Sequence, residues 1–241
     1  MNSMQQALVR AVDRQPAPRE DLYTGIHKAM RALVCDTLVA AGRMDTADET
    51  EVAQTLGRVR LVIELSRHHL HHENQHVHPA MEARRRGASA AAARGHAEHV
   101  QAFERLEALA LRVERNRGPA RDSAALDLYR ELALYAAEDF RHMHAEETEN
   151  NAVLWEHCSD EELKGIHQAI LASVGPRQMT DYLVWFARAM TPAERAALLS
   201  GMREAMPSEV FSGVTQLVKS VLGERDWAKV IAALGSRPLA V

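Results

Sequence analysis

The chain has 241 residues, 46% hydrophobic and 26% charged, with a net charge of −4 at pH 7; this is ordinary for a globular protein and lacks the basic excess of a nucleic-acid-binding surface. Its two cysteines, Cys35 and Cys158, lie far apart and form no CxxC pair, which fits a reducing compartment. Because no stretch approaches the roughly 18 apolar residues of a membrane span and the N-terminus has no apolar signal region, we expect a cytoplasmic protein that binds neither nucleic acid nor membranes.

The predicted fold is all-α. Aromatic residues make up only 5% of the chain, alanine and leucine are abundant, and no segment shows the sustained period-two alternation of a half-buried strand. After an N-terminal segment, residues 1–20, we expect four long helices, the first ending at Gly42 and the second kinked or ended near Pro79. They span about 21–41, 46–83, 89–115 and 122–157.

Residues 158–241 are expected to form an extension of four or five shorter helices packed on the long ones. Ser159 and Glu162 have the S-x-x-E spacing of a capping box, and Thr191 with Pro192 has the pattern of an N-cap followed by a helical proline. The segment LVWFARAM, residues 183–190, is apolar nearly all round. This favours burial against the long helices, with a homodimer through the C-terminal helices as the alternative.

The run HHLHHENQHVHP, residues 68–79, holds six of the chain's 13 histidines. In the helical period Glu73 falls within the apolar stripe of its helix, and His69, one turn earlier, lies on the same face. These two form the predicted inward pair, with His76 as a supporting group behind them. Three others are expected on the solvent face: His68, His71 and His78.

The H-x-x-x-E spacing recurs at His142 and Glu146 in the fourth predicted helix. The apolar stripes of the first and third predicted helices contain His27 and His99, with His96 about 60° around the helix from His99. Four histidines and two glutamates on apolar faces are hard to satisfy without a cation. Imidazole and carboxylate together suit iron, manganese or zinc, and two carboxylates can bridge a metal pair. The sequence therefore predicts a metal site.

Other polar residues near this site have two interpretations. Asp139 is either a support for an imidazole or a residue at the surface edge. Glu147 turns outward on the helical wheel, like His144, and is retained only as a possible supporting group or alternative ligand. Tyr23 and Tyr135 are interpreted as packing residues, with a redox role as the alternative.

With these positions in hand, residues 20–157 resemble the hemerythrin-like (HHE cation-binding) family. The motifs that carry the resemblance are IHKAM with His27, HHLHHENQHVHP with His69 and Glu73, EHVQAFERLEAL with His99, and HMHAEE with His142 and Glu146. The resemblance implies a four-helix up-down bundle, residues 21–157, that holds two iron ions joined by an oxo, hydroxo or water bridge. It also implies the ligands: His27 and His69 on one iron, His99 and His142 on the other, and Glu73 and Glu146 bridging them. Zinc or manganese is the alternative to iron.

Two departures narrow the expected function. Four residues before His99 stands Gly95, where oxygen carriers have a second histidine, so His96 is an alternative ligand; the fourth helix also ends in HxxxE and not HxxxxD. Stable oxygen carriage is therefore not the expectation. The leading hypothesis is a di-iron protein that binds or senses a small diatomic ligand, oxygen or nitric oxide, or that buffers iron. The alternatives are a di-iron oxidase, peroxidase or nitric oxide-handling enzyme, and a helical interaction protein with a structural metal.

Overall fold

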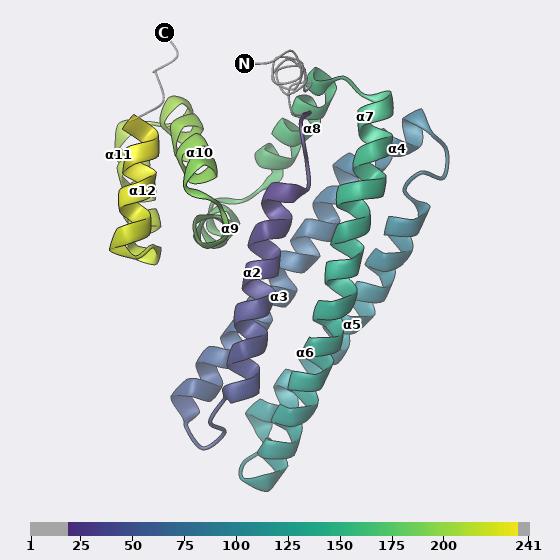
Figure 1. Cartoon of the computed structure of the whole chain (residues 1–241). Coiled ribbons are helices and arrows are strands. Elements are labelled where there is room, and N and C mark those ends of the chain that lie inside the picture. The colour runs from purple at the N-terminus through teal and green to yellow at the C-terminus, as the bar shows by residue number, and fades with distance from the viewer. Residues whose placement is uncertain (1–18, 236–241) are drawn as a thin grey trace, which may run out of the picture.

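The computed structural model describes residues 19–235. The predicted N-terminal segment lies almost wholly outside the described residues, as do residues 236–241 of the predicted extension. Every regular element between residues 19 and 235 is helical, which confirms the all-α prediction (Figure 1). None of these helices is both long and apolar enough to cross a membrane.

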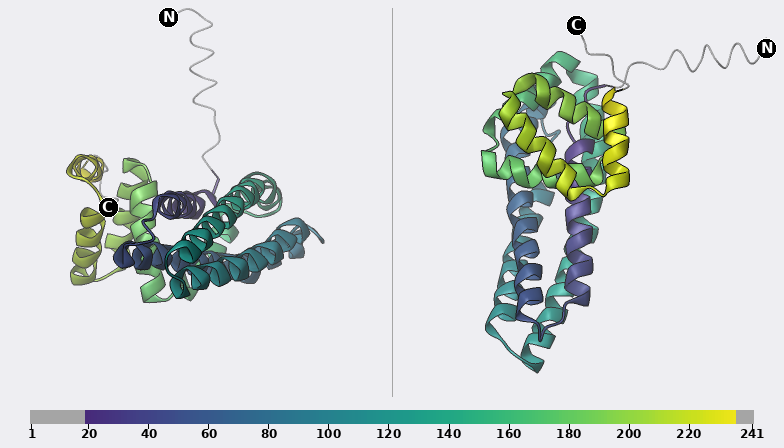
Figure 2. Two further views of the ribbon diagram at one scale, coloured as in Figure 1. Left: turned by 90° about the horizontal axis from the view of Figure 1, so that it is seen from below. Right: turned by 90° about the vertical axis from the view of Figure 1, so that its left-hand side faces the viewer.

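Four long helical segments run side by side in alternating directions (Figures 1 and 2). The contacts link α5 with α6, α6 with α2, α2 with α3, and α3 with α5, so the four segments enclose one interior. The segments are α2 (Thr24–Arg43); α3 (Glu49–His72), η1 (Glu73–Val77) and α4 (His78–Arg84); α5 (Ala90–Arg115); and α6 (Pro119–Ala145), η2 (Glu146–Asn150) and α7 (Asn151–His157).

Apolar stripes fill this interior. Val34 of α2, Leu56 of α3, Leu106 of α5 and Leu132 of α6 are almost completely shielded from solvent and belong to one core cluster. On each helix such residues recur three or four positions apart, so one face is apolar and the opposite face is polar. Burial of these faces against one another is the main force that selects the arrangement.

The residues at which α2 ends and α3 begins differ from the prediction. Gly42 does not end α2; it lies in the last turn, where an added Cβ would stand 2.9 Å from the ring of Tyr129. A glycine here permits close packing between α2 and α6. Helix α3 begins at Glu49 and not near Thr46, because the carboxylate of Asp48 accepts hydrogen bonds from two free backbone N–H groups of the first turn.

A π-helical turn begins at the glutamate of each H-x-x-x-E pair, and no residue pattern in the sequence indicates it. In η1 the N–H of His78 donates to the C=O of Glu73, and in η2 the N–H of Asn151 donates to the C=O of Glu146. Such i→i+5 turns hold one residue more than an α-helical turn, which rotates all later side chains by about 100°. Pro79 follows the first π turn and does not end the helix, because it lies in the first turn of α4.

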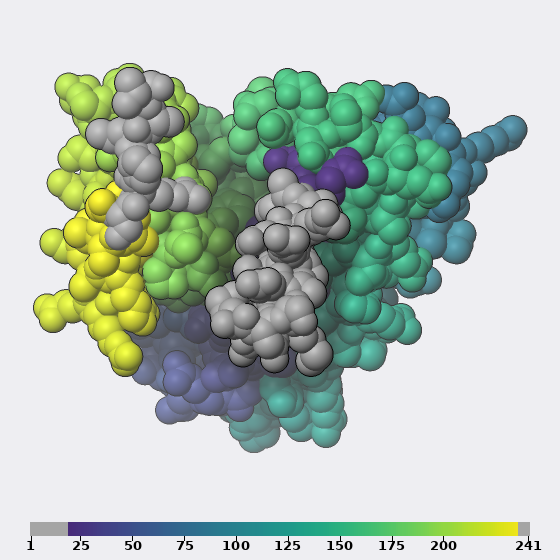
Figure 3. Space-filling model, turned by 45° about the horizontal axis from the view of Figure 1, so that its top comes forward, coloured from purple at the N-terminus to yellow at the C-terminus, as the bar shows by residue number. Residues whose placement is uncertain are grey.

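Five shorter helices follow within the described residues, in agreement with the prediction of four or five. The capping box of Ser159 and Glu162 is present, and Thr191 caps its helix as expected, in a second box with Glu194. The helices are α8 (Asp160–Ser173), α9 (Pro176–Ala189), α10 (Pro192–Ala205), α11 (Ser208–Val221) and α12 (Glu224–Gly235). Helices α10–α12 form a lobe beside the upper half of the long helices (Figure 1), and this lobe lies at the left of the space-filling view (Figure 3).

Helix α9 joins this lobe to the long helices. Tyr182 and Trp185 pack into the core of the long helices, whereas Leu183 and Ala187 pack into the cluster formed with α10–α12. The hydroxyl of Tyr182 donates to the backbone C=O of Leu65 in α3 at 3.0 Å. Burial on two opposite sides explains why residues 183–190 are apolar nearly all round.

Arg121 stabilises the end of the long helices that lies away from the C-terminal lobe. Its side chain is 1% exposed, and its guanidinium donates to the backbone C=O of Asn116, to the backbone C=O of Thr46 and to the carboxylate of Glu49 at 2.8–2.9 Å. The single guanidinium thus donates to backbone carbonyl groups in both loops at this end, residues 44–48 and 116–118.

Replacing Arg121 by methionine should lower the free energy of unfolding by about 2–3 kcal/mol, because two half-buried carbonyl groups and the Glu49 carboxylate lose a buried donor while the side-chain volume is roughly kept. The matched control is Arg117→Met, whose side chain is 64% exposed although it also pairs with Glu49. That change should stay within about 0.5 kcal/mol. Urea unfolding measures both, and equal losses would contradict the role given to Arg121.

Candidate metal centre

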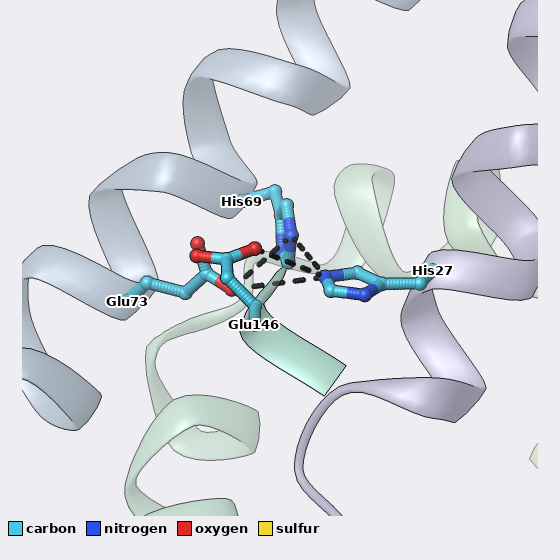
Figure 4. Close-up of side chains that lie close together, drawn as sticks. All are labelled: His27, His69, Glu73 and Glu146. Carbon is cyan, nitrogen blue, oxygen red and sulfur yellow. Dashed lines mark hydrogen bonds and ion pairs between the residues drawn. The ribbon is translucent and has the colours of Figure 1, made fainter. Parts of the chain in front are cut away.

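Four ionisable side chains from three long segments meet inside the protein at the level of the two π turns (Figure 4). Nε2 of His27 lies 3.1 Å from Nε2 of His69 and 3.5 Å from Oε2 of Glu146. Nε2 of His69 lies 3.3 Å from Oε1 of Glu73. All four residues are at least nine-tenths buried, and their donor atoms are close enough together to hold a metal ion.

A second group adjoins the first and shares both of its glutamates. Nε2 of His96 lies 3.2 Å from Oε2 of Glu73 and 3.4 Å from Oε1 of Glu146, and Nε2 of His142 lies 3.2 Å from that same Oε1. Glu73, His96, His142 and Glu146 could also hold a metal ion. Each glutamate therefore points one oxygen at the first group and the other oxygen at the second.

The buried polar atoms of this centre fit a bound cation. Among the described residues, both carboxylate oxygens of Glu73 and of Glu146 lack a hydrogen-bond partner, and so do Nε2 of His96 and of His142. Leaving one such buried group unsatisfied costs about 1–3 kcal/mol, and more for a charged group. A metal ion accepts lone pairs from carboxylates and neutral imidazoles alike, so it would satisfy all of these atoms together.

Electrostatics keep the carboxylates charged in spite of burial. Burial alone would raise the pKa of Glu73, but His69 and the close contacts with His27 and His96 hold that pKa well below its usual range. Burial alone would likewise lower the pKa of His27, yet interactions with Glu147 and Glu73 raise it from 6.5 to about 9. Without metal, protons on the imidazoles balance the carboxylates.

Carboxylate and amide groups orient two of the imidazoles from outside. Nδ1 of His27 lies 3.0 Å from Oε1 of Glu147, which Arg31 holds through contacts of 2.6 and 3.1 Å. Nδ1 of His96 lies 2.9 Å from Oδ1 of Asn74. A partner at Nδ1 turns Nε2, as the lone-pair donor, towards the centre.

The helical wheel therefore misplaced Glu147. The wheel turns Glu147 outward, but its side chain is only 19% exposed, and its Oε1 contacts Nδ1 of His27 in α2. Arg31 and Asn74 were not anticipated. The spacing of the sequence could have indicated Arg31, because it lies one helical turn after His27 on the same face. No feature of the sequence indicates the contact of Asn74 with His96.

Of the two candidate histidines on α5, the structure brings His96 into the second group. His99 is buried, but it packs edge-on against His142 and Tyr135 and belongs to neither donor group. Gly95 contributes to this arrangement, because an added Cβ there would stand 2.6 Å from Nδ1 of His142. The ring of His142 thus occupies space that a side chain at position 95 would fill.

The π turn after His72 changes the environment of the later histidines. His71 is exposed as expected and His68 is half-buried, but His78 is buried and stacks on His96 with ring centroids 4.9 Å apart. The expectation that His78 faces solvent is thus wrong, because the extra residue in η1 rotates it inward by about 100°. His76, expected behind the inward pair, instead lies in a surface cleft against α8.

Three further predicted residues lie beside the centre. Asp139 is 5% exposed, so it is not at the surface edge; burial raises its pKa to about 7 against the opposing effect of His142. Tyr23 packs against the ring of His27 at 5.4 Å between centroids. The hydroxyl of Tyr135 donates to Oγ of Ser66 at 3.0 Å.

Comparison of the chain with models of protein families and with curated proteins finds no match. The assignment of a function therefore rests on the geometry of this centre.

Replacing Glu147 by alanine should weaken metal binding by about 10- to 100-fold, because His27 loses the carboxylate that orients it and increases its basicity. Glu149→Ala is the matched control: it removes an exposed carboxylate from the same π turn and should leave the affinity unchanged. Competition with a chromophoric chelator measures both. A loss of affinity in both variants would mean that net charge, and not the contact with His27, is responsible.

The metal-free chain should lose stability as the pH rises from 6.5 to about 9. The pKa of His27 and that of His96 are raised from 6.5 to about 9, so protonation of the native state stabilises it fully below pH 6.5 and no longer above about 9. Metal binding requires neutral imidazoles, so the increase in Tm caused by metal should grow over the same window. Thermal unfolding at several pH values, with and without metal, tests this; an increase independent of pH would contradict it.

Proposed function

We propose that the chain is a hemerythrin-like di-iron protein that binds or senses a small diatomic ligand such as oxygen or nitric oxide. One observation carries the proposal: each of two buried glutamates directs its two oxygens to two different histidine-containing groups. In this proposal Glu73 and Glu146 would each bind both of two metal ions. In helical proteins, paired carboxylates and histidines of this kind hold di-iron or di-manganese centres.

Within this proposal, residues 21–157 form the four-helix up-down bundle of the family, and residues 158–241 form an extension of it. His27 and His69 bind one ion. His142 and His96 bind the other, with His96 in the place that the resemblance gave to His99. Iron is the metal proposed, since mixed imidazole and carboxylate ligands suit it; zinc and manganese accept similar sets.

The small number of protein donors in each group leaves room for a small exogenous ligand. Each group supplies two imidazoles and a share of two carboxylates, and non-haem iron with few protein donors keeps positions open for such ligands. Bound iron would supply a redox-active, oxygen-reactive centre. The chain's own residues fix the ligand geometry, exclude bulk water and keep the carboxylates charged.

The second candidate is a di-iron enzyme, an oxidase, a peroxidase or a nitric oxide-handling protein, at the same centre. It is supported by Tyr23 and Tyr135, which are both buried beside the histidines. Because both hydroxyls have hydrogen-bond partners, we interpret them as packing residues and favour ligand binding. Anaerobic iron loading followed by oxygen and then nitric oxide separates the two: a reversible adduct supports binding or sensing, whereas one-way oxidation with peroxide turnover supports an enzyme.

Anaerobically iron-loaded protein should contain about two iron atoms per chain, as paired-metal sites in helical bundles do. Glu73→Ala should lose metal and destabilise the fold, because it leaves buried histidines without a counter-charge. His71→Ala removes an exposed histidine two residues away and should change neither property. Elemental analysis with thermal unfolding measures this. A single zinc ion and no iron would refute the di-iron assignment, and metal loss in His71→Ala would contradict the choice of ligand residues.

A further inference from the structure

An apolar cavity lies directly beside the first donor group. It has a volume of about 100 Å³, and its wall is formed by α2 with the residues just before it, by α3 and η1, and by α8 and α9. Two of the candidate metal ligands, His69 and Glu73, form part of the wall. We call this space the α8–α9 chamber.

The C-terminal helices build about half of the chamber. Ile170 and Leu171 of α8 and Met179 and Phe186 of α9 line it, together with Val174 between the two helices. These residues lie outside the segment that resembles a known family. The shape of the chamber therefore depends on how α8 and α9 pack against α2 and η1.

The position of α9 is fixed independently of anything inside the chamber. The hydroxyl of Tyr182 donates to the C=O of Leu65 at 3.0 Å, and Trp185 is buried in the core of the long helices. On the other side, Nζ of Lys28 in α2 lies 2.6 Å from the carboxylate of Glu194 in α10. These contacts hold the α9 side of the chamber in place.

Size limits what the chamber can hold. An apolar protein cavity of about 150 Å³ binds benzene or xenon, so a volume of about 100 Å³ admits a smaller molecule of about two to four heavy atoms. The wall is mainly apolar, and its acidic and basic residues are His69, His72, Glu73 and His167. An anion such as acetate would therefore lose hydration over most of its surface and would face the carboxylate of Glu73. An uncharged molecule loses little and gains contacts with the wall.

We propose that the α8–α9 chamber binds a small, uncharged, apolar molecule and holds it against the His69–Glu73 side of the candidate centre. Helices α8 and α9 then limit the size of the molecule that can lie beside His69 and Glu73, and the donor group determines the chemistry that this molecule undergoes. Occupation of the chamber is independent of metal. Only the inference that the chamber delivers a ligand to the metal centre rests on the proposed di-iron function.

Xenon is the probe for the test, with the full chain carrying isotope-labelled methyl groups. In the metal-free protein, xenon should shift the NMR signals of methyl groups on the chamber wall, Ile26, Val77 and Ile170, more than those of Val34 and Leu132 in the core of the long helices. Cyclopropane should compete with xenon, whereas acetate should not. Absence of any xenon-dependent shift at the wall, or displacement by acetate, would overturn the proposal.

Two substitutions locate the binding. Val174→Trp places a large side chain in the chamber and should abolish the xenon shifts, and Ile170→Trp should do the same from the wall of α8. Ala172→Trp, at an exposed position of α8 outside the chamber wall, is the control and should leave the shifts intact. Circular dichroism establishes that each variant is folded. Unchanged shifts in a folded Val174→Trp or Ile170→Trp protein would overturn the assignment.

The same samples separate this proposal from the proposed function. Iron content is measured alongside xenon binding in the unmodified chain. Xenon binding without iron uptake would support the chamber and refute the di-iron function. Iron uptake without xenon binding would refute the chamber alone.

Discussion

The burial of two carboxylates among imidazoles is the constraint on which the rest of the structure depends. Glu73 and Glu146 lie in the interior, each with both oxygens shielded and without a hydrogen-bond partner among the described residues. A charge of this kind is tolerated only next to compensating charges or a metal. Histidines from four different long helices supply that compensation, so the centre ties these helices together at one level.

The two π turns show how local backbone structure serves this centre. Each begins at a glutamate of the centre and adds one residue to the turn that follows. The residues before the turn keep the spacing that aligns His69 with Glu73 and His142 with Glu146, whereas those after it are rotated. The rotation brings His78 against the ring of His96, and Pro79 follows in the first turn of α4. Support from Glu147, Arg31 and Asn74 then holds the imidazoles with Nε2 towards the centre.

The sequence predicted the features that repeat with the helical period. The inward direction of His69, Glu73, His142 and Glu146 follows from a spacing of three or four residues. The all-helical fold, the four or five C-terminal helices and both N-caps follow from composition and from cap and proline patterns. The errors begin where the period changes: His78 was misplaced because no residue pattern marked the π turn. Glu147 and the choice between His96 and His99 depend on contacts between helices, which a wheel drawn for one helix does not contain.

The central claim is that two metal ions share Glu73 and Glu146. Anomalous X-ray diffraction from crystals of the iron-loaded full chain, collected at the iron edge, tests it most directly. We predict two separate peaks between the helices, one bounded by His27 and His69 and the other by His96 and His142, with one oxygen of each glutamate facing each peak. A single peak, or iron bound only outside these six side chains, would contradict the account.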